Sequence, residues 1–346
     1  HELVVPEISI LAPIGISYYT LSIIGYVLDV YWELCEPQKN LMKHLLYTIY
    51  FPVLTSGPIL KYSMMEKELF TLHKFDHIKV LHGIQRIIWG LFKKLVIADR
   101  VAIFVSAVYG DYEKYSGVYI VLAIILFALQ LYTDFSGCMD IVGGVSECFG
   151  IKIPENFNSP FFAETVAEFW KRWHITMGDW FKDYILYPMM KSRVNRKLIE
   201  KLRKHFGKKA SKDISTYLCM LILWITIGIW HGGAWKYILA SGLIPGFFLI
   251  AGQATRPLAE KVVKVFRIKT DVLSWKIFRM MRTFACMCMS WVFVRAEGVR
   301  DGINILLNVK NNFTLAPLFD GSMYQLGLTW MDFNVIYFGV LILLVV

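Results

Sequence analysis

Long apolar stretches recur along almost the whole chain, and they constrain its fold more than any other feature of the sequence. A helix rises 1.5 Å per residue, so roughly 20 apolar residues cross about 30 Å of hydrocarbon. Hydrophobic residues make up 56% of the 346 positions and charged residues only 18%, which does not describe a soluble surface. Eight stretches are candidate spans: 8–30, 42–60, 80–109, 116–135, 215–230, 235–253, 275–296 and 331–346.

These stretches predict an all-α polytopic membrane protein with about eight or more transmembrane helices, accompanied by re-entrant and interfacial helices. We expect a single membrane domain over residues 1–346. The first stretch begins almost at residue 1 without a basic-then-apolar leader, and the last still runs as apolar sequence into Val346. These features favour a longer parent protein, truncated at both ends.

The basic residues behind the net charge of +10 gather between the apolar stretches. The richest segment is 191–214, whose only acids are Glu200 and Asp213. The positive-inside rule places this segment, predicted to be a loop, in the cytoplasm of a multi-pass plasma-membrane protein. This pattern predicts contact with the bilayer and no nucleic-acid partner. Counting spans outward puts 61–79 and 254–274 inside, and 31–41, 110–115 and 297–330 outside.

Two segments depart from a plain spanning helix. In 116–150, an apolar stretch runs into acidic residues and the pair Gly143-Gly144, which predicts a broken or re-entrant helix. In 164–187, aromatic residues recur at helical spacing on one face and charged residues lie on the other. We therefore predict an interfacial helix over 164–187, with its aromatic face at the headgroup boundary.

Three polar residues in or beside apolar sequence are candidates for chemistry. His231 interrupts the span 215–235, and an ionisable residue at such a position is a functional candidate, although a hydrogen-bonded core histidine is an equally good interpretation from composition. The following Gly232-Gly233 favours function, because glycines let backbone or substrate approach the ring. His174 borders the aromatic face of 164–187, as an amphipathic interfacial residue also would. Asp134 ends an apolar run and could equally cap a helix.

Several kinds of site lack support in the sequence. Phosphate-binding loop, zinc-protease, serine-hydrolase and EF-hand motifs do not occur. The six cysteines lie singly or as one Cys-x-Cys, and neither His174 nor His231 has a carboxylate at ligand spacing. We therefore expect no metal site. A transporter or flippase remains open, because broken helices and polar residues at mid-membrane depth are equally typical of transporters.

Six segments together resemble the membrane-bound O-acyltransferase family, nearest its bacterial branch of alginate O-acetyltransferases and teichoic-acid D-alanylation proteins. They occur in family order over almost the whole chain. They are PIGISYYTLSIIGYVLDVY at 13–31, FPVLTSGPILKY at 51–62, GLFKKLVIADR at 90–100, LYTDFSGCMDIVGGVSECFGIKIPENFNSPFFA at 131–163, EFWKRWHITMGDWFKDYILYP at 168–188 and GIWHGGAW at 228–235. Met189-Met190-Lys191 and Cys138-Met139 depart from the family's more common residues at these positions.

The resemblance implies that His174 and His231 correspond to the family's two functional histidines. We interpret His231 as the general base and His174 as a residue that positions donor or acceptor. Asp134, Trp230 and Trp173 are expected to line the site, and no cofactor is expected to be tightly bound. The implied co-substrate is an acyl thioester, either acetyl-CoA or an acyl carrier protein. The implied acceptor is a hydroxyl of a polysaccharide, reached directly or through a partner extracytoplasmic transferase.

The acyl group stays open at this stage. Acetyl transfer to a cell-surface or exported polysaccharide is the first hypothesis, since DFSGCMD and GIWHGGAW are closer to the acetylating branch. D-alanyl transfer from a carrier protein to teichoic acid is the alternative within the family, favoured by TSGPI.

Overall fold

The structure, a computed structural model, describes residues 15–345 and consists of helices. Within these residues no strand forms, apart from one isolated antiparallel bridge between Phe157 and Trp173. The all-helical prediction is therefore confirmed. The α-helices are α1 Ile16–Tyr31, α2 Leu41–Thr48, α3 Tyr62–Phe70, α4 His77–Leu91, α5 Asp99–Gly110, α6 Val118–Cys148, α7 Val166–Phe169, α8 Ile175–Phe181, α9 Tyr187–Lys191, α10 Arg193–Trp230, α11 Trp235–Ile238, α12 Ile244–Ala254, α13 Arg256–Val265, α14 Leu273–Arg295, α15 Val299–Asn308 and α16 Trp330–Val345.

Four helical runs are long and apolar enough to cross a membrane, judged by length and composition. They are α6, α10, the run Trp235–Ala254 that joins α11 to α12, and α14. A fifth apolar helix, α16, has 16 residues. The predicted eight spans are thus not confirmed. The stretch 8–30 and the motif at 13–31 both begin outside the described residues, and the stretch 331–346 ends outside them.

The predicted span 42–60 is not a spanning helix. α2 has 8 residues, or about 12 Å of helix, and a short 3₁₀ turn and extended chain follow it. The predicted alternation of sides counted 42–60 as a span, so it loses this support and stays a prediction. Trp32 stacks on Tyr184 with ring centroids 6.0 Å apart, and Trp32 and Lys191 line one cavity. The adjoining ends of 31–41 and 191–214 therefore lie close together.

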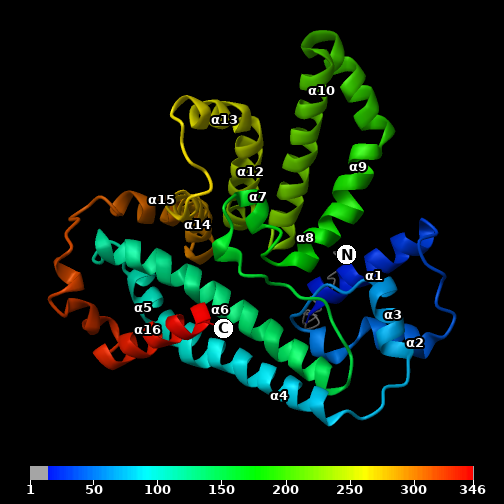
Figure 1. Cartoon of the computed structure of the whole chain (residues 1–346), viewed down its shortest axis with the longest axis horizontal. Helices are drawn as coiled ribbons and strands as arrows, with labels where there is room; N and C mark the ends of the chain where they lie inside the picture. Colours follow the sequence, from blue (N-terminus) through cyan, green and yellow to red (C-terminus); the bar gives the residue numbers. More distant parts are fainter. Residues whose placement is uncertain (1–14, 346) are drawn as a thin grey trace, which may run out of the picture.

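The predicted break in 116–150 is also wrong, because α6 runs unbroken over 31 residues. Its glycines serve close packing instead. A Cβ added to Gly90 of α4 would lie 2.5 Å from the carbonyl oxygen of Gly137, and one on Gly83 would lie 2.5 Å from that of Gly144. α4 and α6 run side by side at backbone distance (Figure 1), which only residues without a side chain permit.

The basic segment 191–214 is helical, not a loop. α10 reverses direction at Gly207, whose φ of 76° and ψ of 176° suit glycine. The side chain of Ser215 on the returning half donates to that of Asn195 on the outgoing half, at 2.6 Å. The result is a basic helical hairpin that projects from the body of the molecule (Figure 1). Local helix-forming residues override the loop expected from their charge.

Residues 164–187 do not form one helix either. The range comprises α7, a turn that contains His174, α8 and a π-helical segment at Lys182–Leu186 that leads into α9. The aromatic face is buried within the protein: Met177, Trp180 and Phe181 pack into a cluster with residues of α1 and α10. Tertiary packing, rather than a headgroup layer, covers this face.

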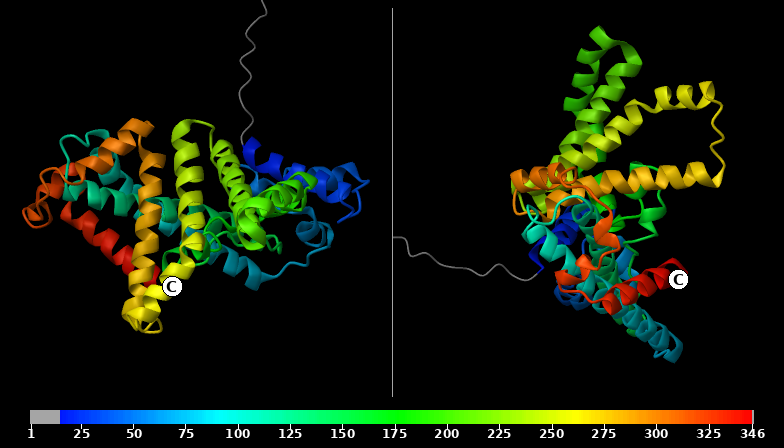
Figure 2. Two further views of the ribbon diagram at one scale, coloured as in Figure 1. Left: turned by 90° about the horizontal axis from the view of Figure 1, so that it is seen from above. Right: turned by 90° about the vertical axis from the view of Figure 1, so that its left-hand side faces the viewer.

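The larger core cluster lies where α5, α6 and α14 meet, and it also takes in residues of α15 and α16. α12, α13 and α14 form a second projecting arm, separate from the basic hairpin (Figure 2). Between these arms and the α4–α6 layer lies the irregular chain 149–174, which carries one of the two histidines.

The glycine contact between α4 and α6 predicts a specific stability change. Gly90→Ala places a methyl group against backbone, which cannot move as a flexible side chain can, so we expect a loss of about 1–3 kcal/mol. Thermal unfolding of the detergent-purified protein should show a melting temperature lower by several degrees. The matched control is Gly252→Ala in α12, where nothing lies within 4 Å of the added Cβ. An equal fall in both variants would contradict the packing role.

Candidate active site

His174 lies in the turn between α7 and α8, in a strained backbone conformation. Its φ of 47° and ψ of 53° belong to the left-handed region, which costs a non-glycine residue about 1–3 kcal/mol. The neighbouring segment 156–158 overdetermines this conformation. The backbone N–H of Asn158 donates to Arg172 at 2.9 Å, and that of Ile175 donates to Asn156 at 3.1 Å. Segment 156–158 is thus hydrogen-bonded to the chain both before and after His174.

His231 lies at the end of α10, where it is the C-cap residue. The next two residues leave the helix with positive φ, 144° at Gly232 and 71° at Gly233, and both values favour glycine. A Cβ on Gly232 would also lie 2.9 Å from the ring of Tyr237. The sequence His-Gly-Gly therefore lets the chain turn sharply into α11 while His231 stays at the helix end.

The structure brings both histidines next to the ring of Trp230. The ring centroid of Trp230 lies 6.2 Å from that of His174 and 4.8 Å from that of His231. His231 is exposed and His174 is 3% exposed. Neither residue therefore stands alone as an isolated core or interfacial histidine, and the two form a buried and an accessible half of one site.

One ring nitrogen of His174 has no hydrogen-bond partner within the described residues. This atom, Nδ1, is buried, and an unpartnered buried polar atom costs about 1–3 kcal/mol. Burial, together with the neighbouring His231, lowers the pKa of His174 well below its usual value, so the ring is neutral at cellular pH. A neutral imidazole can donate one hydrogen bond and accept another, and such an orphaned atom is typical of a functional site.

Aromatic rings close the site around the histidines. Phe135 of α6 meets His174 edge-on with centroids 4.8 Å apart. Tyr18 of α1 and Phe181 of α8 meet Trp230 at 5.9 and 6.0 Å. Rings from α1 and α8 therefore pack on Trp230 and one from α6 packs on His174, and of the expected lining residues Trp230 alone has ring contacts with both histidines.

Asp134 and Trp173 lie elsewhere. The carboxylate of Asp134 pairs with Lys94 of the π-helical segment at 3.0 Å, with about half of its side chain exposed, and no described contact joins it to either histidine. Trp173 is buried in the larger core, packed against Phe157 and Trp291 with centroids 5.0 Å away. Asp134 precedes Phe135 and Trp173 precedes His174 in the sequence, but the side chains of Asp134 and Trp173 point away from the histidine site.

A cavity of about 550 Å³ lies near the base of the basic hairpin. It is lined by Asp29, Trp32, Leu34, Lys61, Ser63, Asp183, Tyr184, Tyr187, Pro188 and Lys191. Lys61 pairs with Asp183, and the Tyr184 hydroxyl donates to buried Asp29 at 2.8 Å. The cluster of Tyr184, Trp180 and Phe181 fills the space between this cavity and the Trp230 ring.

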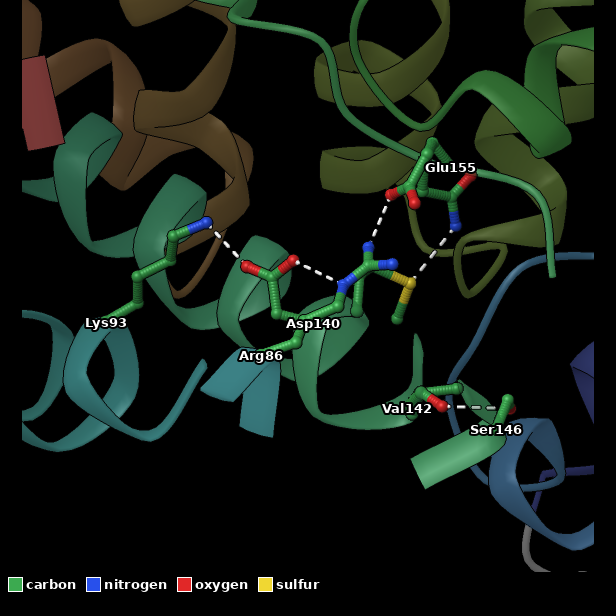
Figure 3. Close-up of polar contacts among 8 residues, drawn as sticks. Arg86, Lys93, Asp140, Val142, Ser146 and Glu155 are labelled. Carbon is green, nitrogen blue, oxygen red and sulfur yellow. Dashed lines mark hydrogen bonds and ion pairs between the residues drawn. The ribbon is translucent and has the colours of Figure 1, made fainter. Parts of the chain in front are cut away.

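Sequence reasoning missed this cavity and an ionic network behind the site. Arg86 donates to Asp140 at 3.2 Å and to Glu155 at 2.5 Å, and Lys93 donates to Asp140 at 2.6 Å (Figure 3). Asp140 stands in the apolar part of α6, so the rule that singled out His231 could have found it. That Arg86 of α4 is its partner follows only from the packing of the two helices.

The comparisons with known proteins agree with the resemblance. The model of the membrane-bound O-acyltransferase family matches residues 37–202. A peptidoglycan O-acetyltransferase of Helicobacter pylori is 28% identical over 323 residues, covering 86% of this chain and 56% of that protein.

Two further relatives extend the comparison. A probable alginate O-acetylase of Azotobacter vinelandii is 30% identical over 276 residues, covering 78% of this chain and 51% of that protein. A teichoic acid D-alanyltransferase of Bacillus subtilis is 28% identical over 245 residues, covering 68% and 57% respectively. The chain spans about half the length of the curated relatives it matches. By its motifs and these matches, the chain is similar to the membrane-bound O-acyltransferase family, whose model matches residues 37–202.

Proposed function

We propose that this protein transfers an acyl group, in the first instance acetyl, from a thioester donor to a hydroxyl group of a polysaccharide. The observation that carries the proposal is the pair His174 and His231 beside the one ring of Trp230, the first buried and the second exposed. Related proteins act as O-acetyltransferases on peptidoglycan and alginate, so the acceptor proposed here is of the same chemical class.

His231 is the proposed general base. The acceptor hydroxyl oxygen attacks the thioester carbonyl carbon while the His231 imidazole takes the hydroxyl proton. The carbon–sulfur bond then breaks, and the leaving thiolate recovers that proton from His231, so charge and protons balance. Base catalysis of this kind is typically worth about 10²–10⁴-fold in rate. The Gly232-Gly233 turn places no side chains beside the ring, which would let the acceptor approach it.

His174 is proposed to hold the thioester near His231. Its neutral ring and unpartnered Nδ1 offer one hydrogen bond to the donor or to the negative charge that develops on the carbonyl oxygen. Its strained backbone directs the ring toward Trp230, since the turn itself is clamped by segment 156–158. A hydrogen-bond donor that is already in position stabilises the transition state more than one that must first reorganise.

The cavity beside the basic hairpin is the proposed donor entrance. Lys61 and Lys191 line it together with the rings of Trp32 and Tyr184, a combination that suits the phosphate and adenine groups of acetyl-CoA or the phosphate of a carrier-protein arm. Cys219 of α10 lies near the base of the hairpin, and His231 lies 12 positions further along the helix, about 18 Å along its axis. A slender thioester arm from the cytoplasmic side would span this depth.

The other partners are proposed from the charge pattern of the chain and from its relatives. We place the basic hairpin in the cytoplasm of a multi-pass plasma-membrane protein, by the positive-inside rule, and the acceptor on the outer side. A partner extracytoplasmic transferase could carry the acyl group onward from this site. D-alanyl transfer to teichoic acid is the second candidate, supported by the similarity to a teichoic acid D-alanyltransferase. Mass spectrometry of surface polysaccharide from a deletion strain distinguishes acetyl from D-alanyl.

The histidine assignment predicts a graded loss of activity. His231→Ala and His231→Gln should lower acyl transfer by about 10²–10⁴-fold, because the base is removed, and His174→Ala should lower it less severely. Acyl transfer is measured with purified protein in nanodiscs, using radiolabelled donor. His205→Ala is the matched control, since this exposed histidine lies on the basic hairpin. Full activity of His231→Gln would remove the base assignment.

A transporter or flippase makes the opposite prediction for the same variants. Transport of an acyl donor or glycan across proteoliposomes would survive His231→Ala, since the fold and pathway stay intact. Transport that persists in His231→Ala, together with undetectable acyl transfer by the wild type, would replace the proposed function.

The donor entrance predicts a separate kinetic effect. Lys191→Gln should raise KM for acetyl-CoA about fivefold, equivalent to ~1 kcal/mol, with kcat little changed, because a partly exposed ionic contact is lost. The effect should shrink as salt is added. Lys197→Gln on the same hairpin, outside the cavity lining, should leave KM unchanged. Equal changes in the two variants would mean that the hairpin's overall charge, not the cavity, attracts the donor.

A further inference from the structure

The buried side chain and the backbone of Asn156 both accept hydrogen bonds from the residues that follow His174. Asn156 is 1% exposed. Its Oδ1 accepts hydrogen bonds from the backbone N–H of Thr176 at 3.0 Å and from the Thr176 hydroxyl at 2.7 Å. Its backbone carbonyl accepts from Ile175 at 3.1 Å. Three hydrogen bonds thus tie one buried asparagine to the two residues that follow His174.

Thr176 passes the connection on to a third segment. Its hydroxyl oxygen accepts from the backbone N–H of Ile59 at 2.9 Å, so the hydroxyl is used both as donor and as acceptor. Ile59 ends the TSGPI segment, and the side-chain amide of Asn156 reaches back to the sulfur of Met139 on α6 at 3.1 Å. Three of the segments that carry the family resemblance therefore meet at one buried polar centre.

The ionic network of Arg86, Lys93, Asp140 and Glu155 lies next to this polar centre. Arg86 of α4 holds Glu155, the residue next to Asn156, while it also contacts Asp140 of α6 (Figure 3). Lys93, 7% exposed, completes the charge on the other side of Asp140. The segment that bears Asn156 thus has contacts with two helices, α4 through Glu155 and α6 through Met139.

The strain at His174 makes this anchoring necessary. A non-glycine residue at φ 47° persists only where its surroundings overdetermine it, and the unpartnered Nδ1 of His174 supplies no restraint of its own. We propose that Asn156, acting through Thr176, is a positioning residue for the acyl-transfer reaction, which holds the His174 ring against Trp230. The inference rests on the proposed function for its kinetic test, but not for its spectroscopic one.

The first measurement is kinetic. Asn156→Ala should lower kcat about 10–100-fold with KM for the donor unchanged within about twofold, because misplacement of a reacting group by about 1 Å can cost this much. Thr176→Val should lower kcat in the same direction, and Thr176→Ser, which keeps the hydroxyl, should retain it. In a His174→Ala background, Asn156→Ala should cause no further loss, since two residues that act as a unit are not additive.

A matched control separates positioning from general stability. Asn195→Ala removes another buried asparagine, 6% exposed, whose Oδ1 accepts from Ser215, and it should leave kcat unchanged. A similar fall of kcat in Asn195→Ala, or an undiminished further loss from Asn156→Ala when His174 is already alanine, would overturn the inference. Wild-type kcat in Asn156→Ala would overturn it as well.

The second measurement does not depend on catalysis. In protein labelled with ¹⁵N-histidine, the ring signal of His174, assigned by its absence in His174→Ala, should shift or broaden in Asn156→Ala and Thr176→Val. It should stay in place in Asn195→Ala and Thr176→Ser. An unmoved signal in Asn156→Ala sinks the inference even if acyl transfer is established. A moved signal in a protein without acyl transfer leaves the positioning intact and removes the proposed function instead.

Discussion

The backbone contact between α4 and α6 is the constraint on which the rest of the structure depends. Gly83 and Gly90 on one helix face Gly144 and Gly137 on the other, so the two helices approach without intervening side chains. This approach brings Arg86 and Lys93 of one helical run onto Asp140 of the other. A wider spacing would leave Asp140 as an unpaired charge in an apolar helix, which is far costlier than the paired one.

A short series of contacts connects the α4–α6 layer to the candidate active site. Arg86 holds Glu155, Asn156 holds Thr176 and Ile175, and these flank the strained His174. The second histidine arrives by a different route, at the end of α10, where glycines turn the chain. The site is thus assembled from a clamped turn and a helix end, and the ring of Trp230 lies next to both imidazoles. Rigid placement of this kind suits a reaction in which two substrates must meet in one geometry.

The surroundings of the two histidines differ, and the proposed division of labour follows that difference. His174 is enclosed and neutral, whereas His231 is open to whatever occupies the space beside the Gly-Gly turn. A cavity with lysines lies beyond one aromatic layer, at the base of a basic hairpin. This difference suits a reaction in which the donor is held beside the enclosed His174 and the acceptor reaches the exposed His231 from another direction.

The sequence by itself determined the all-helical class, the apolar character of the long helices and the two histidines worth testing, because composition, periodicity and motif order are local properties of the chain. It could not determine where helices end or reverse: 42–60 holds a short helix, 116–150 is unbroken and 191–214 is a helical hairpin. Nor could it say that Asp134 and Trp173 face away from the histidines or that Asn156 holds one of them. These outcomes were decided by tertiary structure, since a glycine that breaks one helix packs another, and a buried polar side chain acquires its role only from the partner that distant chain brings to it.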